Sequence, residues 1–334
     1  MSGGMVLVGE AWGREEAEQG VPFVGHAGRI LNGVLSQAGI ARSECYVTNV
    51  LNLQPKPTND IKNCCGPRMG GIPGMPSLTA GKYMRNEYAP ELARLYRELD
   101  REKPNLIVAL GATAAWALLK TTGIAKIRGA PAMSPWGKCL ATFHPQAVGY
   151  DWSLRPVLFA DLCKAKREAE YAELRRPQRE VYLPDTPADL DRFADLHMSR
   201  FDLLSIDIET VGGDIITCVG FAPSIDRTLV VPFFDPQRPG RNYWPTTADE
   251  RLAWDWVKRI CEGDRPKVFQ NGLFDINVLW RTMGIRVRNA THDTMLAHHA
   301  LQPEMKKGLA FLGSIYTNEA SWKLMRRASA KREE

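Results

Sequence analysis

Residues 203–210, with the sequence LLSIDIET, form the most informative stretch of the chain. The segment is apolar, rich in β-branched residues and long enough for a buried β-strand. Because residues two apart in a strand point to the same face, Asp207 and Glu209 are expected to project side by side. Neighbouring carboxylates repel each other unless a cation lies between them, and oxygen ligands suit Mg²⁺ or Mn²⁺. The alternative is an exposed strand end with two solvated acids.

Two later segments favour a metal site. Residues 267–275 (KVFQNGLFD) predict a short strand, an Asn-Gly break and an acid, Asp275, that opens a helix running to Met283. Residues 291–297 (THDTMLA) predict another helix start. A strand-borne D-x-E, an N-x-x-x-D motif and an H-D-T-M-L-A segment, in this order, resemble the DnaQ-like 3′–5′ exonuclease domain, and most closely the proofreading domain of family A DNA polymerases.

This resemblance implies an α/β, RNase H-like fold for residues 177–334 and phosphodiester hydrolysis assisted by two metal ions. It assigns Asp207, Glu209 and Asp275 as catalytic residues and as ligands of Mg²⁺ or Mn²⁺. The family also uses a late Y-x-x-x-D or H-x-x-x-D element, whereas residues 316–320 read YTNEA. We therefore expect a domain that is truncated, completed by a second chain, or no longer a nuclease.

Length and composition indicate two domains that meet near residue 176. A chain of 334 residues exceeds one typical domain, and residues 164–180 are dense in Lys, Arg and Glu. Before this segment strands alternate with helices, which predicts a three-layer αβα domain on a parallel sheet over residues 1–176. The expected strands are 5–9, 45–50, 105–110 and 138–143, and the expected helices are 27–38, 86–102, 112–121 and 156–172. Residues 55–81, rich in Gly, Pro and Asn, are expected to form a long surface loop.

Polar or aromatic residues stand where the strands of the first domain end. Glu10 follows the first strand, Asn49 lies near the end of the second, and His144 follows the last. Phe23 lies on a glycine-flanked loop. Because ligands of open α/β sheets bind outside the carboxyl ends of the strands, we expect these side chains to meet. Taken singly, they are equally compatible with a solvated acid, a turn cap, a strand-end histidine and a core aromatic.

The order of these motifs resembles the family 4 type of the uracil-DNA glycosylase superfamily, over about residues 5–165. The motifs are GEAWG at 9–13, GVPFVGHAG at 20–28, YVTNV at 46–50, ALGATA at 109–114, RG at 128–129 and HP at 144–145. The resemblance implies an enzyme that takes uracil out of the DNA stack into a pocket and hydrolyses its glycosidic bond.

The resemblance also assigns roles to individual residues. Phe23 is expected to stack on the uracil, and Asn49 to read its edge through an amide that both donates and accepts. His144 is expected to stabilise the negative charge that develops on uracil O2, and Glu10 to position the attacking water. Gly9 and Arg155 are assigned to substrate binding. Residues 146–155 are expected to enter the minor groove, with a wedge formed by Val148, Tyr150 or Trp152.

Two departures from the family concern its pocket and its cofactor. Trp12 stands where the family has proline, directly beside the water site. Family 4 enzymes hold an iron–sulfur cluster on four cysteines, but Leu53 and Tyr88 stand near two of those positions and the other two lie upstream of the first strand. We therefore expect no iron–sulfur cluster, and we interpret Cys64 and Cys65 as free thiols.

Charge and cysteine content set the expected location and partners. The net charge of +5 is mildly basic, which is compatible with DNA contact without requiring it. Seven cysteines, an odd number at irregular spacing, favour a reducing cytoplasm, that of a bacterial host if a phage encodes the chain. No signal-peptide pattern and no apolar run of membrane-spanning length is found, so no membrane association is expected.

These features predict a DNA repair or replication protein that combines a uracil-DNA glycosylase domain with a proofreading-type exonuclease domain, as in the N-terminal part of phage-type family A DNA polymerases. Its expected partner is uracil-containing DNA, single- or double-stranded. The alternative is a catalytically weak module that binds DNA or uracil and docks to a separately made DNA polymerase subunit. A nucleotide-binding oxidoreductase is disfavoured because no G-x-G-x-x-G follows the first strand.

Overall fold

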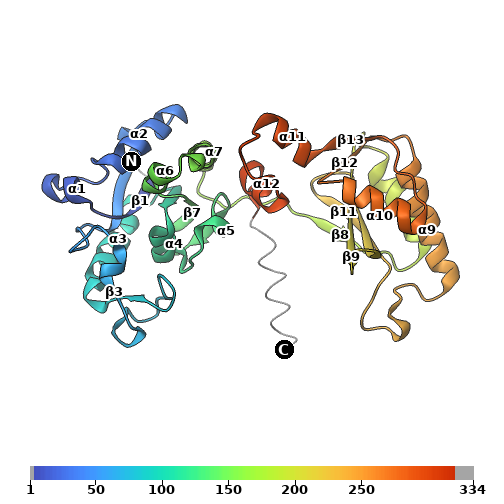
Figure 1. The fold of residues 1–334 in the computed structure, drawn as a ribbon, viewed down its shortest axis with the longest axis horizontal. Helices are drawn as coiled ribbons and strands as arrows, with labels where there is room; N and C mark the ends of the chain where they lie inside the picture. Colours follow the sequence, from blue (N-terminus) through green and yellow to red (C-terminus); the bar gives the residue numbers. More distant parts are fainter. Residues whose placement is uncertain (1–3, 320–334) are drawn as a thin grey trace. The chain divides into compact units, whose positions relative to one another are not determined.

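The computed structural model describes residues 4–319 and divides the chain into two compact units (Figure 1). Of the described residues, 4–175 and 310–319 form the first unit, and 176–309 form the second. Residues 310–319, which the sequence analysis placed in the second domain, are therefore grouped by their contacts with the first unit. Helix α12 (Leu309–Tyr316) supplies most of this returning segment.

The first unit is built on a five-stranded sheet with the order β2-β1-β5-β7-β6. Strands β2, β1, β5 and β7 are parallel, and only the edge strand β6 runs antiparallel to its neighbour. The predicted parallel sheet is confirmed for these four strands, whereas the antiparallel strand β6 was not predicted. The strands are β1 (Met5–Ala11), β2 (Cys45–Leu51), β5 (Leu106–Leu110), β6 (Pro131–Ser134) and β7 (Gly137–Thr142).

Helices cover both faces of this sheet because alternate strand residues point to opposite sides. Leu7 packs in one apolar core with residues of α2 (His26–Gln37) and α7 (Arg155–Glu168). Val6 and Val8 pack in another core with residues of α3 (Ala89–Glu102) and α4 (Ala112–Leu119). The expected three-layer αβα architecture is confirmed. Short helices α1 (Arg14–Gln19), α5 (Ile124–Ile127) and α6 (Pro145–Tyr150) lie in the connections.

The segment expected as a long loop, residues 55–81, is more ordered than predicted. It contains short 3₁₀ turns, and strand β3 (Cys65–Gly66) pairs with β4 (Tyr83–Met84) as a two-stranded sheet. Ile61, Cys64 and Leu78 are buried and join the core beside α3 and α4. Elements of two residues are too short to show periodicity in a sequence, which explains why they were not predicted.

The second unit contains a mixed six-stranded sheet with the order β13-β12-β9-β10-β11-β8. Its central strands β9, β10 and β11 are antiparallel, whereas β12 and β13 run parallel to β9. The strands are β8 (Glu180–Tyr182), β9 (Leu204–Val211), β10 (Ile215–Ala222), β11 (Arg227–Pro232), β12 (Lys267–Phe269) and β13 (Ala290–Asp293). The helices include α8 (Pro187–Phe193), α9 (Thr247–Glu262), α10 (Leu273–Met283) and α11 (Thr294–Leu301). The α/β class expected here is confirmed.

Strand β9 shows the alternation predicted for residues 203–210. Leu204, Ile206 and Ile208 are buried in the core of the unit, whereas Asp207 and Glu209 lie on the exposed face between them.

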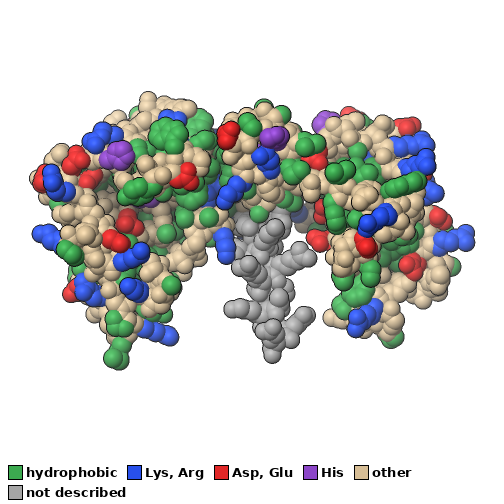
Figure 2. All heavy atoms as spheres, viewed as in Figure 1, with side chains coloured by type: hydrophobic (Ala, Val, Ile, Leu, Met, Phe, Trp, Pro, Cys, Tyr) green, Lys and Arg blue, Asp and Glu red, His purple; other side chains and the backbone are tan. Residues whose placement is uncertain are grey.

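On the face shown in Figure 2, neither unit has a surface patch of one charge. On the face shown in Figure 2, basic and acidic side chains are interspersed over each unit. None of the helices within residues 4–319 is long and apolar enough to cross a membrane.

Candidate functional sites

A cavity of about 470 Å³ lies in the first unit at the carboxyl ends of β1 and β2. Glu10, Phe23, Asn49 and His144 all line it, as expected from their positions at strand ends and on the glycine-flanked loop. A cavity of this size is typical of small-molecule sites. Further lining residues, not predicted from the sequence, include Glu16, His26, Asn59 and Gln146.

Gly9 lies close to two of these side chains, those of Asn49 and Phe23. It pairs with Asn49 across the parallel β1–β2 ladder. A Cβ atom on Gly9 would lie 2.2 Å from Asn49 Oδ1 and 2.5 Å from Phe23 Cζ. Any larger residue would therefore displace the amide or the ring. Asn49 and Phe23 are both buried, so their approach is a packed arrangement.

The loop that carries Phe23 is held in an unusual conformation. Phe23 has φ of 55°, in the left-handed region that non-glycine residues rarely adopt. The buried carboxylate of Glu16 accepts the backbone N–H groups of Val24 and Gly25, at 3.1 and 2.8 Å. The guanidinium of Arg42 donates to the Phe23 carbonyl oxygen at 3.2 Å. These contacts fix the ring against the cavity.

Glu10 is a partly desolvated carboxyl group at the end of β1. Burial raises its pKa, a short hydrogen bond from the Thr113 hydroxyl lowers it, and repulsion from Asp60 raises it further; the net change is upward. Thr113 belongs to the first turn of α4. The hydroxyl group therefore orients one carboxylate oxygen and favours its ionised form.

His144 is held as a neutral imidazole. Burial lowers its pKa to about 4, with a smaller opposing effect of Glu16. Its Nδ1 accepts the backbone N–H of Gln146 at 3.1 Å, at the start of α6. Because Nδ1 is the acceptor, the single proton of the neutral ring lies on Nε2. The ring lies 5.7 Å from that of Phe23, with a tilt of 30°.

The three candidate wedge residues differ sharply in exposure. Val148 is fully buried, so the expectation that it forms a wedge is wrong. Tyr150 is 84% exposed and lines the cavity, and Trp152 is 66% exposed. The guanidinium of Arg155 lies 5.3 Å from the centre of the Trp152 ring and is not among the lining groups of the cavity.

Trp12 occupies the wall of the cavity beside Glu10. Its backbone N–H donates to the Leu53 carbonyl at 3.2 Å. Its indole N–H is buried and makes no hydrogen bond within the described part of the chain.

Leu53 and Tyr88 stand near two positions of the family's cluster cysteines. The Tyr88 hydroxyl accepts a hydrogen bond from Arg85 at 3.2 Å.

The second unit gathers three acids around strand β9. The Asp275 carboxylate, at the start of α10, accepts the Ile208 backbone N–H at 3.0 Å. Partial desolvation, then repulsion from Asp275 and from Glu209, raises the pKa of Asp207 to about 6. Burial likewise raises the pKa of Asp275, against the opposing hydrogen bond from Ile208. The cluster therefore carries an excess of negative charge that a cation would relieve.

These acids fit a hydrated Mg²⁺ or Mn²⁺ better than a closed metal cage. Within residues 4–319 no three His, Cys, Asp or Glu side chains form a group that could hold a metal ion. Magnesium, however, is usually bound by one or two carboxylates together with water and substrate phosphates. The donor chemistry and the mutual repulsion of Asp207 and Asp275 suit that mode.

Asp293 serves the fold instead. Its carboxylate accepts the backbone N–H groups of Asn271, Gly272, Met295 and Leu296, at 2.8 to 3.2 Å. Burial raises its pKa, but these four hydrogen bonds outweigh that effect and the pKa is lowered. The residue thus caps α11 and fixes the turn before α10.

Comparison with known sequences gives one match for each half of the chain. The profile of the uracil DNA glycosylase superfamily matches residues 3–172, and that of a 3′–5′ exonuclease family matches residues 185–331. The type-4 uracil-DNA glycosylase of Archaeoglobus fulgidus is 34% identical over 173 residues, which are 48% of this chain and 74% of that protein. The Thermotoga maritima protein of the same name is 33% identical over 171 residues, 48% of this chain and 76% of that one.

Solved structures resemble the chain only in part. The EXD2 exonuclease domain soaked with Mn and GMP matches with a TM-score of 0.28 and 19% identity, covering 37% of this chain and 59% of that one. Brucella melitensis NrnC with bound Mg²⁺ matches with a TM-score of 0.29 and 16% identity, covering 44% of this chain and 64% of that one.

Proposed function

The chain belongs, through residues 3–172, to the uracil DNA glycosylase superfamily, and we propose that its first unit hydrolyses the N-glycosidic bond of uracil in DNA. One observation carries the proposal. The cavity brings together an aromatic ring, an amide, a carboxylate and a neutral imidazole, those of Phe23, Asn49, Glu10 and His144. The two relatives named above are type-4 uracil-DNA glycosylases, and their matches to this chain extend over about three-quarters of their length.

Recognition of the base follows from the packed group around Gly9. A uracil turned out of the DNA stack would lie on the Phe23 ring, since aromatic faces are good platforms for bases. The Asn49 amide donates to a carbonyl oxygen and accepts from an N–H, which matches the edge of uracil and not that of cytosine. Gly9 lets the amide approach the base without obstruction.

Bond cleavage needs a stabilised leaving base and a positioned water. The His144 Nε2–H is a donor at physiological pH, because the ring is neutral and Nδ1 is occupied. It would stabilise the negative charge that develops on uracil O2 as the bond breaks. Ionised Glu10 would orient the attacking water and favour the positive charge that develops on the sugar. The Thr113 hydroxyl holds that carboxylate in place.

A second candidate function is binding of uracil or DNA without cleavage. Trp12 favours it, because an indole in the wall beside Glu10 narrows the space for water. The two functions differ in one product, the abasic site.

A uracil-containing oligonucleotide, single- or double-stranded, tests both functions. After incubation with the protein, hot alkali breaks the strand wherever uracil has been released. We expect breaks at uracil that are lost in Asn49→Ala and His144→Ala and retained in Asn105→Ala, whose amide bonds the Ala169 carbonyl elsewhere in the unit. Retained binding without breaks at high protein concentration would overturn the glycosylase and support the binding module.

The second unit is proposed to remove nucleotides from DNA 3′ ends. Asp207, Glu209 and Asp275 would supply one or two carboxylates to each Mg²⁺ or Mn²⁺, with water and substrate phosphate as the other ligands. The bound metal would supply an activated water and neutralise the leaving oxygen. The match of residues 185–331 to a 3′–5′ exonuclease family supports this activity. Metal-dependent shortening of a 5′-labelled strand is expected to vanish in Asp207→Ala and to persist in Asp214→Ala, an exposed acid paired with Arg281. Activity that persists in Asp207→Ala would refute the metal assignment.

The proposed setting is DNA replication or repair together with a DNA polymerase, encoded by a phage and acting in the cytoplasm of its host. The order of a glycosylase and a proofreading-type exonuclease supports this setting. All seven cysteines are free thiols, as a reducing compartment requires. Co-purification of a polymerase from infected cells, lost when the second unit is removed, would test the partner.

A further inference from the structure

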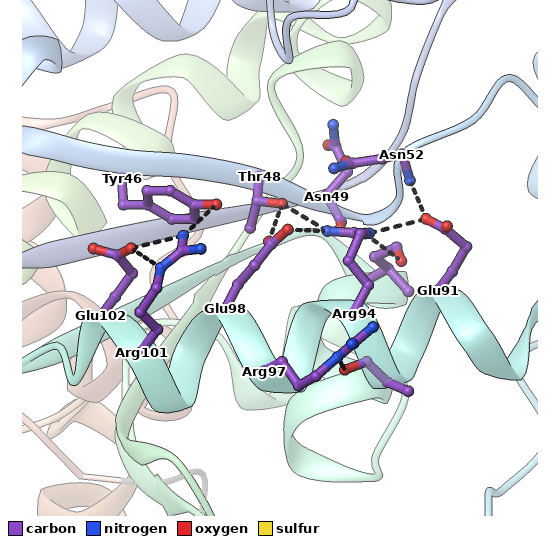
Figure 3. Close-up of polar contacts among 12 residues, drawn as sticks. Tyr46, Thr48, Asn49, Asn52, Glu91, Arg94, Arg97, Glu98, Arg101 and Glu102 are labelled. Atoms are coloured by element: carbon purple, nitrogen blue, oxygen red, sulfur yellow. Dashed lines mark hydrogen bonds and ion pairs between the residues drawn. The ribbon is translucent and has the colours of Figure 1, made fainter.

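Arg94 links helix α3 to the end of strand β2 that carries Asn49 (Figure 3). Its guanidinium donates to the backbone carbonyl oxygens of Asn49 and Val50, at 2.8 and 3.2 Å. It also donates to the Thr48 hydroxyl at 3.2 Å. One side chain therefore holds three consecutive residues of the strand, with Asn49 at their centre.

These contacts satisfy backbone groups at the edge of the sheet that have no partner strand. Strand β2 is the outermost strand and pairs only with β1, so its outward-facing backbone groups have no neighbouring strand. A strand end held on one side only is free to twist. The planar, five-donor guanidinium can satisfy several carbonyl groups at once, which the single ammonium of lysine cannot do in the same geometry.

Arg94 is itself held rigidly. It forms ion pairs with Glu91 at 3.1 Å and with Glu98 at 2.8 Å, which lie one turn before and one turn after it along α3. The three side chains are only 20%, 24% and 14% exposed. Glu98 also accepts the Thr48 hydroxyl at 2.8 Å, and Glu91 accepts the Asn52 backbone N–H at 2.7 Å. The helix thus grips β2 through a charged cluster that has little freedom to move.

We propose that Arg94 is a positioning residue for Asn49, one that sets the direction of its amide toward the base; this role rests on the proposed uracil-reading function of Asn49. The amide is closely packed, because a Cβ atom at Gly9 would lie only 2.2 Å from Asn49 Oδ1 and 2.5 Å from Phe23 Cζ. A shift of the strand end would turn the amide away from the uracil edge and leave the sheet intact. Arg94 acts through Asn49 and does not line the cavity.

Arg101 provides a matched control. It lies on the same helix and bonds the same strand, donating to the Tyr46 hydroxyl at 3.2 Å, three residues before Asn49. It also pairs with a carboxylate, that of Glu102, at 2.9 Å. Arg101→Met and Arg94→Met therefore remove the same charge and a helix–strand contact from the same two elements, but only Arg94→Met releases the backbone of Asn49.

The experiment measures three quantities for each variant of the full chain: single-turnover release of uracil from an oligonucleotide, inhibition by free uracil, and binding of the same oligonucleotide without uracil. For Arg94→Met we expect uracil release to slow by roughly 10- to 100-fold, the loss typical of a misplaced group. Inhibition by free uracil should weaken about 10-fold, since one reading contact is lost. Binding of uracil-free DNA should stay unchanged. In uracil release and in uracil inhibition, Arg94→Lys should fall between the wild type and Arg94→Met. Arg101→Met should match the wild type in all three measurements.

Two results would overturn the proposal. The first is inhibition of Arg94→Met by free uracil that equals the inhibition of Arg101→Met. The second is a parallel loss of uracil inhibition and of uracil-free DNA binding in Arg94→Met, as a general loss of structure would produce. If the wild-type protein releases no uracil, the glycosylase proposal fails by itself. Equilibrium dialysis with free uracil then still compares the two variants, and a wild type that binds no uracil ends the role of Arg94 as well.

Discussion

At the scale of single residues, the first site consists of groups whose protonation is set by their surroundings. Burial makes His144 neutral, whereas burial and Asp60 push the pKa of Glu10 upward against the hydrogen bond from Thr113. The acid limb of a pH–rate profile for kcat/KM should therefore report the proposed base Glu10, because His144 is already neutral above pH about 4.

Replacement of Thr113 by valine should move that limb to higher pH. The hydroxyl lowers the pKa of Glu10 by stabilising the ionised form, so its removal raises the pKa further. The direction of the shift follows from the loss of one hydrogen bond to a charged group. At high pH the rate should stay near that of the wild type. Thr122→Val, an exposed threonine beyond the same helix, serves as the control; a limb that stays in place or moves to lower pH would contradict the assignment.

The motifs predicted which residues line this site, but not what holds them. Glu10, Phe23, Asn49 and His144 each stand at the end of a strand or on a glycine-flanked loop, which a sequence reveals. Thr113 reaches Glu10 across 103 residues, a contact that only the folded sheet creates. Glu16 is intermediate. An acid three residues after Gly13 is a helix-start pattern, so its hydrogen bond from the Gly13 N–H was open to prediction, whereas those from Val24 and Gly25 were not.

At the scale of elements, long periodic segments were predicted well and short ones were not. Strand β9 and helix α10 lie where the alternation of residues 203–210 and the acid at 275 placed them. Helix α6 was missed, since its six residues span less than two turns. All three elements contribute to the candidate sites. Strand β9 and helix α10 carry the acids of the second unit, and α6 forms part of the rim of the cavity.

The repulsion between β9 and α10 predicts how the second unit responds to metal. In the folded state the pKa of Asp207 is raised from 3.8 to about 6, so ionised Asp207 costs stability above pH 6 and costs nothing below pH 3.8. Asp207→Asn should therefore raise the free energy of unfolding of the metal-free protein at pH 7.5 by about 1 kcal/mol. This value is smaller than the pKa shift alone implies, because solvent screens the exposed side chain. The gain in stability should vanish near pH 4.

Divalent metal provides the complementary measurement for the same element. Mn²⁺ should raise the melting temperature of the wild type, because it binds the folded acids, and should have little effect on Asp207→Asn. Asp214→Asn should respond like the wild type, since its partner is Arg281. An equal response of Asp207→Asn and the wild type to Mn²⁺ would exclude this cluster as the metal site.

The segment from α6 to α7 predicts a difference between single- and double-stranded DNA. Tyr150 and Trp152 project from this rim, and a wedge is needed only where a neighbouring base pair must be replaced. The double variant Tyr150→Ala, Trp152→Ala should lose about 10-fold in uracil release from duplex DNA and much less from a single strand. Met69→Ala, a fully exposed apolar residue in the same unit, is the control. Equal losses on both substrates would assign the aromatic pair to general DNA binding.

At the scale of the whole molecule, each unit has its own apolar core, and the chain crosses from the first unit to the second and returns. The return was not predicted, because residues 310–319 continue the exonuclease-like sequence pattern while their contacts lie in the first unit. Sequence similarity reports ancestry, whereas packing reports which surfaces are satisfied. At the end of α12, the carbonyl oxygens of Ser314 and Thr317 need hydrogen-bond donors, and the first unit supplies one. The apolar side chain of Leu312 is buried as well.

Lys164 is the donor, and its removal should destabilise the first unit alone. The buried ammonium of Lys164 donates to the carbonyl oxygens of Gly129, Ser314 and Thr317, at 2.5 to 2.7 Å. Lys164→Met leaves these buried acceptors without a donor, at a cost of about 3 kcal/mol. Calorimetry should show the melting transition of the first unit lowered by roughly 6–10 °C, with the transition of the second unit in place. Lys166→Met, exposed on the same helix, should change neither transition. If both transitions fall together in Lys164→Met, the two units unfold as one, and α12 belongs to both.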